Sequence, residues 1–223
     1  DTTVRTSHRG ISHYNGLYDQ SRYFDNAMTR FYMRKGWGVC QFSLLRQMSE
    51  LLIEKTLVER YPDLQALQVS CHAAHKEGES IRPCGRCEKC RRIIGMLLAL
   101  EADPSRCGYT PGQVETALAD LAVKEVHQEG PGAQHMIRLL LDRGLLPRDA
   151  PTGRSAVERP EVMKLRFDPE RSPFETTPGD LRETLLRQLL QHSEGAVRRS
   201  GRVWLDFDPL ADPGLTAPYP FQT

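Results

Sequence analysis

The sequence contains no apolar run of the roughly 18 residues that a membrane-spanning helix needs, because charged or polar residues interrupt every hydrophobic stretch. It also lacks the basic segment followed by an apolar segment that marks an N-terminal secretory signal. We therefore expect a soluble, cytoplasmic protein with no membrane contact. The first residue is Asp1 and not Met, which suggests a processed chain or a segment of a longer protein.

An excess of charge of either sign is also absent. Lys and Arg together number 30, Asp and Glu number 29, and the formal net charge is +1. A protein without a large net charge has no long-range field that attracts nucleic acid, so the total charge argues against a nucleic-acid partner, and any charged binding surface must be local. The 223 residues are enough to bury a substantial core.

Cysteine is concentrated in one segment. Four of the six cysteines lie within residues 71–90, and PCGRCEKC places Cys84, Cys87 and Cys90 at two successive Cys-x-x-Cys spacings. Disulfides are rare in proteins that are not secreted, and a redox motif of the thioredoxin type carries no third cysteine at this spacing. A Cys-x-x-Cys turn places two sulfurs on one side of a zinc ion. The pattern therefore predicts a zinc site.

This site needs a fourth ligand, for which four residues compete on spacing alone: Cys71, His72, His75 and Cys107. We favour Cys71, which ends a predicted strand and can return through the loop before Cys84. A helix separates Cys107 from the cluster by about 20 Å at 1.5 Å per residue. With four protein ligands the zinc is structural, since a catalytic zinc keeps a position open for water. Cys40 and Cys107 are then expected to be small buried residues.

Spacing of apolar residues at three and four positions predicts a series of helices. They cover residues 18–35, 44–61 and 91–102, a segment after Thr110-Pro111, and residues 133–143 and 180–192. Short strands are predicted at 37–42, 67–70 and 202–207. The order of elements indicates an α/β protein, with the cysteines on a loop that enters a helix.

The character of the sequence changes after Leu146. Six prolines between residues 147 and 178 accompany little hydrophobic periodicity, which is typical of an extended linker or arm. We therefore predict two domains. Residues 1–147 would form a zinc-bearing lobe with a small helical bundle, and residues 148–223 a proline-rich arm with one helix and a short strand.

Three segments together resemble a known family. YDQSRYFDNAMTRFY, QFSLLRQMSELLIEKTLVERYPDL, and QVSCHAAH with PCGRCEKC are similar to the C-terminal part of the 7-cyano-7-deazaguanine synthases, which are PP-loop ATP pyrophosphatases. The resemblance covers roughly residues 15–110. In that family the positions that match Cys71, Cys84, Cys87 and Cys90 hold one zinc ion.

The resemblance implies the C-terminal part of a doubly wound, HUP-like α/β fold with a four-cysteine zinc loop and, in this chain, a helical extension. Family members use ATP and Mg²⁺ to adenylate a carboxylate, and they bind the phosphates with an SGGxDS loop. No Ser-Gly-Gly occurs in these residues. The ATP-binding lobe is therefore expected on an upstream segment or on a partner chain, and the catalytic residues are not identified.

The same resemblance assigns substrate contacts. Asp19 and Arg22 match family residues at the lip of the substrate cleft and are predicted to orient a polar small molecule. The family often has Thr-Lys or Ser-Lys where this chain has Ser49-Glu50, so the deazaguanine substrate itself does not follow from the resemblance.

Two functions are consistent with these features. One is the zinc-bearing part of an ATP-dependent ligase or synthase that activates a carboxylate-type substrate. The other is a non-catalytic zinc module that binds RNA or a protein partner through the basic residues between Arg82 and Arg92 and through the tail.

Overall fold

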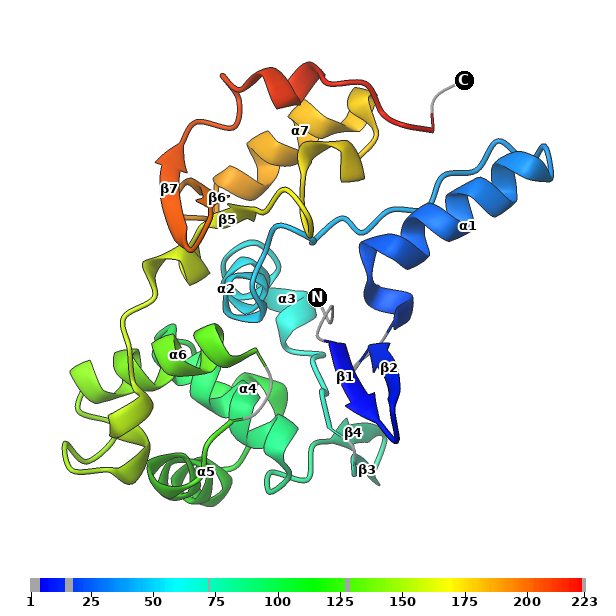
Figure 1. Cartoon of the computed structure of the whole chain (residues 1–223). Helices are drawn as coiled ribbons and strands as arrows, with labels where there is room; N and C mark the ends of the chain where they lie inside the picture. Colours follow the sequence, from blue (N-terminus) through cyan, green and yellow to red (C-terminus); the bar gives the residue numbers. More distant parts are fainter. Residues whose placement is uncertain (1–4, 15–17, 72, 127–128, 222–223) are drawn as a thin grey trace. The chain divides into compact units, whose positions relative to one another are not determined.

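A computed structural model describes residues 5–14, 18–71, 73–126 and 129–221. The chain is a mixed α/β protein (Figure 1) that divides into two compact units. Residues 49–164 form one, here called the helical unit, and residues 1–48 together with 165–223 form the other, here called the sheet unit. The sheets within the described residues are small, with two, two and three strands.

The helical unit consists, over its described residues, of helices and one short hairpin. These elements are α2 (Glu50–Arg60), α3 (Pro62–Gln65), β3 (His75–Glu77), β4 (Ser80–Arg82), α4 (Glu88–Ala99), α5 (Pro111–Val123) and α6 (Gly130–Asp142). Strands β3 and β4 pair antiparallel. Short 3₁₀ helices lie at Pro104–Cys107, Pro151–Ser155 and Pro160–Met163.

Helix α4 forms the centre of this unit. Ile94 and Leu97 are fully buried, and full burial of such a side chain stabilises a fold by about 1.5–3 kcal/mol. Gly95 lets α5 and α6 approach closely, since a Cβ atom there would lie 2.9 Å from both Leu121 Cδ1 and Met136 Sδ. A larger residue at position 95 would push these helices apart.

Local capping explains where two helices begin. Thr110 and Gln113 form a reciprocal capping box at α5, with Pro111 in the first turn, as the Thr110-Pro111 signal predicted. Ser49 caps α2 by accepting from Leu52 N at 2.9 Å. The predicted helix at 44–61 is therefore wrong in its first turn, because Leu44 and Leu45 precede the cap and are exposed.

Residues 148–164, for which we expected an extended linker, pack into the helical unit. Val162 and Met163 are buried in its core, and the Thr152 hydroxyl donates to Leu121 O at 2.7 Å. The division into compact units thus differs from the predicted domain change at residue 147. Residues 165–223 join the unit that contains residues 1–48.

The sheet unit combines helices with two small sheets. Its elements are β1 (Arg5–His8), β2 (Ile11–Tyr14), α1 (Arg22–Arg34), β5 (Leu165–Phe167), α7 (Gly179–Leu190), β6 (Ala196–Ser200) and β7 (Val203–Phe207), with short 3₁₀ helices at Tyr18–Gln20, Phe174–Thr176 and Pro213–Thr216. Strands β1 and β2 form a hairpin. In the other sheet β5 pairs parallel with β6, and β6 pairs antiparallel with β7. The strand predicted at 202–207 and the helix predicted at 180–192 are thereby confirmed.

Aromatic packing holds the three-stranded sheet to the segment that follows β5. Phe167 stacks on Phe174 with ring centroids 4.4 Å apart, and Phe207 meets Phe167 edge to face at 5.3 Å. Such pairs contribute about 0.5–1.5 kcal/mol beyond the area they bury. The sheet therefore has a small aromatic core of its own.

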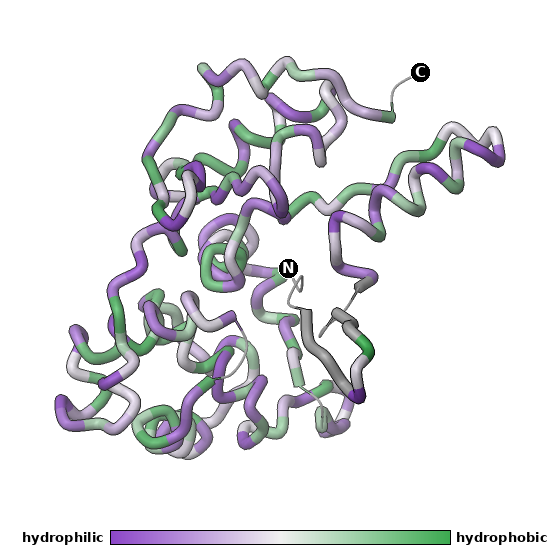
Figure 2. Tube along the Cα trace, viewed as in Figure 1, coloured by the Kyte–Doolittle hydropathy of each residue, from purple (hydrophilic) through white to green (hydrophobic). Residues whose placement is uncertain are grey.

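Helix α1 buries polar residues and exposes apolar ones. Asp25 and Thr29 are buried, whereas Tyr23 and Phe31 are 47% and 40% exposed. Figure 2 shows hydrophobic and hydrophilic residues alternating along this helix. The strand predicted at 37–42 is not formed: Gln41 N and Gln41 O bond the Thr29 hydroxyl at 2.9 and 3.1 Å, so a helix side chain replaces a partner strand.

The strand predicted at 67–70 is also wrong. Leu67 is 75% exposed, and its N–H donates to Leu64 O in a turn that ends α3. Cys71 lies shortly after this turn.

Candidate metal centre

Local structure brings three cysteines to the start of α4. Cys84 follows β4, Cys87 is the N-cap of α4, and Cys90 lies in its first turn. Gly85 has φ of +70°, a conformation that costs little only for glycine, and Gln113 packs where a Cβ atom would lie. The turn between Cys84 and Cys87 therefore depends on glycine and adjoins the start of α5.

Cys71 completes the group from the loop after α3. The four sulfurs, those of Cys71, Cys84, Cys87 and Cys90, all lie within 4.8 Å of one another. Three separations are 3.9 Å (Cys71 to Cys87), 3.8 Å (Cys84 to Cys90) and 3.5 Å (Cys87 to Cys90). Tetrahedral zinc with bonds of about 2.3 Å requires sulfurs about 3.8 Å apart. The cluster can therefore hold a metal ion such as zinc.

Backbone amides point at these sulfurs. Ala73 N and Cys84 N donate to Cys71 Sγ at 3.3 and 3.2 Å, and Cys90 N donates to Cys87 Sγ at 3.5 Å. Hydrogen bonds to a thiolate stabilise its negative charge. The backbone is thus arranged for deprotonated cysteines.

Two of the sulfurs differ in acidity. Burial acts to raise the pKa of Cys84, but hydrogen bonds from the backbone of Arg86 and Cys87 outweigh it, and this pKa falls to about 6. Burial raises the pKa of Cys90 to about 12. Because zinc binds thiolates, a zinc ion at this site would displace the proton of Cys90.

Cys107 lies apart from this group, in the buried turn Pro104–Cys107. Its thiol donates to Gln65 O at 3.3 Å and accepts from Gln65 Nε2 at 2.6 Å, and burial raises its pKa to about 11. Its expected burial is confirmed. Cys40 is exposed, so its expected burial was wrong, because the segment around it forms no strand.

Of the two histidines considered as ligands, the structure describes His75. His75 lies in exposed strand β3, and its side chain is not among the cluster's ligand atoms. His72 lies outside the described residues. The structure thus groups the four cysteines that the sequence selected.

Two of the basic residues that follow the cysteines, Arg91 and Arg92, have acidic partners. Arg92 Nη2 lies 2.8 Å from Glu50 Oε1, and Arg91 Nη1 lies 3.5 Å from Asp120 Oδ2. Both of these arginine side chains are nearly buried. Cations that are buried and already paired are poorly placed to contact RNA phosphates. The anionic Glu50 thus serves as the partner of Arg92.

The predicted substrate contacts belong to the sheet unit. Asp19 is exposed in the 3₁₀ turn before α1, and Arg22 donates to Pro169 O and Glu170 O at 3.3 and 2.6 Å. Arg22 therefore joins α1 to the loop after β5. Contact of either residue with a substrate stays a prediction.

Sequence reasoning missed a buried polar cluster in the same unit. The Asp25 carboxylate pairs with Arg46 and accepts from Ser43 Oγ at 2.8 Å and Gln41 Nε2 at 3.1 Å. The only sign of this cluster in the local sequence was an acidic residue on the inner side of a helix. Its partners come from a segment that we predicted as strand and helix.

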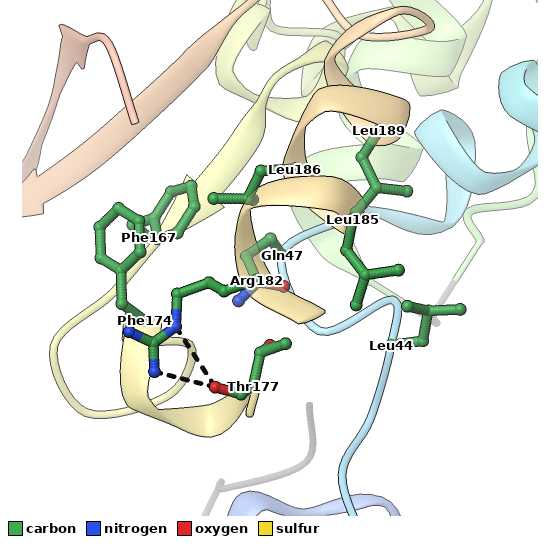
Figure 3. Close-up of a pocket in the computed structure, with 9 residues that line it drawn as sticks. All are labelled: Leu44, Gln47, Phe167, Phe174, Thr177, Arg182, Leu185, Leu186 and Leu189. Atoms are coloured by element: carbon green, nitrogen blue, oxygen red, sulfur yellow. Dashed lines mark hydrogen bonds between the residues drawn. The ribbon is translucent and has the colours of Figure 1, made fainter. Parts of the chain in front are cut away.

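A small pocket in the sheet unit is lined mainly by leucines and phenylalanines (Figure 3). Its one charged residue, Arg182, is already engaged: the guanidinium donates to Thr177 O, Gly214 O, Leu215 O and Ala217 O at 2.8–3.3 Å. The group holds backbone in place, so the pocket offers no charged group for recognition of a small molecule.

Comparison with protein-family models, with curated proteins and with solved structures gave no significant match. Among the described helices, none combines the length and the apolar character needed to cross a membrane.

Proposed function

We propose that Cys71, Cys84, Cys87 and Cys90 bind one structural zinc ion. The grouping of four thiol sulfurs within 4.8 Å carries this proposal. Four cysteines fill all four corners of a tetrahedron and leave no position for a reacting water. The ion would supply folding energy by tying the loop at Cys71 to the first turn of α4.

We further propose that the chain is the zinc-bearing portion of an ATP-dependent enzyme similar to the 7-cyano-7-deazaguanine synthases. The quoted resemblance supports this, together with the family's zinc positions and the cysteine grouping. In this scheme a substrate carboxylate oxygen attacks the α-phosphorus of ATP and pyrophosphate leaves. Ammonia or another nucleophile then displaces AMP. The SGGxDS loop, Mg²⁺ and the rest of the HUP-like sheet would lie outside this chain.

The metal proposal is tested by mass spectrometry of the purified chain under native and denaturing conditions. One zinc per chain is expected in the native spectrum, and none after Cys87→Ser. Cys40→Ser, which changes an exposed cysteine, is the control and keeps its zinc. A zinc-free native chain, or zinc retained by Cys87→Ser, would refute the site.

The enzymatic proposal has a separate test. A companion polypeptide that leaves only on denaturation, or an SGGxDS segment encoded upstream, is expected. The assembled protein should then release AMP and pyrophosphate from ATP when a carboxylate substrate is supplied. A zinc-loaded chain with neither a companion nor an upstream segment would retain the metal site and refute the enzyme.

One observation favours the alternative, a zinc module that binds RNA or a protein partner. Residues 30–40 contain three cations and no acidic residue. Tyr32 stacks on Trp37 with centroids 5.7 Å apart, and Lys35 Nζ lies 5.7 Å from the centre of the Phe31 ring. Exposed aromatics among cations are typical of surfaces that stack single-stranded bases.

This alternative predicts RNA binding that weakens steeply with salt. Trp37→Ala should reduce the affinity about tenfold, as base stacking contributes roughly 1–3 kcal/mol. Tyr61→Ala, which removes a 44% exposed aromatic of the helical unit, is the control. Gel shifts at two salt concentrations that show no binding would eliminate the RNA version.

A further inference from the structure

The two edges of the three-stranded sheet differ. At the β5 edge, Arg166 N donates to Gln47 O at 2.8 Å, so a neighbouring segment bonds that edge. At the other edge β7 has a strand on one side only, because the sheet order over the described residues is β5-β6-β7 (Figure 1). A further strand can therefore pair with the outer edge of β7.

β7 is short and carries one charged residue, Asp206, but it has no Pro, Lys or bulge to keep this edge strand single. Natural edge strands often carry Pro, Lys or a bulge, whereas β7 reads Val-Trp-Leu-Asp-Phe and pairs with β6 in continuous register. Val203 and Leu205 are each 55% exposed. They point to the same face as Phe207, because side chains alternate along a strand. The strand thus presents an apolar face at an open edge.

The sequence of β7 is complementary to itself when reversed. An antiparallel pair of β7 strands centred on Leu205 sets Leu205 opposite Leu205 and Val203 opposite Phe207. Arg202 in the turn before β7 and Asp208 directly after it flank the strand, so the same register brings Arg202 of one copy near Asp208 of the other, once at each end. The apolar face continues across the pair, and cross-strand pairs of opposite charge are favourable. An unrelated strand would match these charges only by chance.

We propose that β7 pairs antiparallel with β7 of a second copy of this chain, about a two-fold axis at Leu205. The two sheets then join into one sheet that crosses both copies. A single pair of five-residue strands is a small interface, so the dimer forms reversibly, with a dissociation constant roughly in the micromolar range or weaker. This inference is independent of the zinc site and of any ATP chemistry.

The first test is sedimentation of the zinc-loaded chain of 223 residues over a range of concentrations. A reversible monomer–dimer equilibrium is expected, and Leu205→Lys should abolish it, because it would bring two like charges together at the axis. Zinc content and the circular dichroism spectrum show whether this variant remains folded. A monomer at all concentrations, or a dimer unaffected by Leu205→Lys in a folded protein, would overturn the proposal.

Charge exchange tests the register. Arg202→Asp alone and Asp208→Arg alone should each weaken the dimer about tenfold, since each removes two opposite-charge pairs. The double variant restores the pairs in reversed order and should recover most of the affinity. Failure of the double variant to recover, with both single variants folded, would contradict the Arg202–Asp208 contact.

Disulfide trapping tests the axis itself. In a Cys40→Ser background, Leu205→Cys places two thiols opposite each other, with Cβ atoms about 4.5–5.5 Å apart. Val203→Cys is the matched control, because in this register its own copy lies about 13 Å away along the strand. Mild exchange with oxidised glutathione should link Leu205→Cys dimers far more readily. Equal linking of the two variants would overturn the proposed register.

Discussion

Arg92 of α4 donates to Glu50 at the first residue of α2, with Nη2 and Oε1 2.8 Å apart. The pair joins the helix that carries Cys90 to the helix that precedes Cys71. The side chain of Arg92 is 8% exposed and that of Glu50 is 39% exposed. Burial raises the pKa of Glu50, and Arg92 opposes that rise. The ion pair thus helps to support the cysteine cluster.

Replacement of Arg92 by Met should destabilise the helical unit, because it leaves the Glu50 carboxylate, whose pKa burial already raises, without the cation that opposes this rise. A loss of about 1–3 kcal/mol in the free energy of unfolding is expected, less than for a fully buried pair. Urea denaturation of the zinc-loaded protein measures it. Asp142→Asn, which breaks the exposed Arg138–Asp142 pair, is the control and should change stability by less than about 0.5 kcal/mol. Equal effects would contradict the structural role of the Arg92–Glu50 pair.

Glu54 gives the helical unit a dependence on pH. It is 4% exposed in α2, with Gln68 Nε2 2.7 Å from its Oε2. Burial raises its pKa above the ordinary 4.5, and the charge of Glu50 adds to the rise. Cys107 also lies near it. The folded state holds this proton more tightly than the unfolded state does. The protonated Glu54 side chain therefore makes its full contribution to stability below the ordinary pKa, and this contribution decreases as pH rises through the folded-state pKa.

Glu54→Gln should therefore stabilise the protein at neutral pH, by on the order of 1 kcal/mol, and should make no such gain in acid. The difference in unfolding free energy between variant and wild type, measured at each pH, isolates this effect because both proteins share the same zinc site and the same Glu50. A difference that does not grow as pH rises from acid to neutral would show that Glu54 ionises normally in the folded protein.

The sequence predicted the elements whose determinants are local. The spacing of Cys84, Cys87 and Cys90 requires only one turn and the start of a helix, and Thr110-Pro111 specifies the start of α5 within a few residues. It could not predict that residues 37–42 lack a strand. Strand formation there depends on a neighbouring strand, and the Thr29 hydroxyl of α1 bonds Gln41 instead.

Long-range polar contacts could not be predicted from the sequence either. Arg182 occupies a position on α7 that reads as a polar surface residue between leucines, yet it is 2% exposed. Three of its carbonyl partners lie at residues 214–217, in a distant part of the sequence. The same holds for the pairing of Asp25 with Arg46. A residue pattern cannot show which backbone carbonyls will meet a buried cation.

Arg182→Met should unfold or loosen the sheet unit. The substitution keeps apolar volume but leaves the carbonyl groups around Arg182 without their donor, and a loss of about 3–5 kcal/mol is expected. Arg182→Lys should recover only part of this lost stability, because one ammonium group cannot reproduce the planar set of N–H donors of a guanidinium. Arg187→Met on the same helix breaks an exposed pair with Glu183 and is the control. Its effect on chemical denaturation should stay within about 0.5 kcal/mol.

Removal of the metal should loosen the region around the cysteines before the rest of the chain. Without a cation, the four sulfurs within 4.8 Å of one another would lose the ion that joins them, and the loop at Cys71 would lose its link to α4. Structural zinc contributes roughly 10 kcal/mol or more in small domains. A strong chelator at neutral pH should therefore raise amide hydrogen exchange first in residues 71–100.

The β7 strand provides the internal reference for this experiment, because it belongs to the sheet unit. Its exchange should change little on chelation, and re-addition of zinc should restore protection in residues 71–100. Cys87→Ser should behave as the chelated protein does without any chelator. An unchanged exchange pattern at the cysteine segment, in protein shown by mass spectrometry to have lost its zinc, would mean that packing of α4 against α5 and α6 alone maintains this part of the fold.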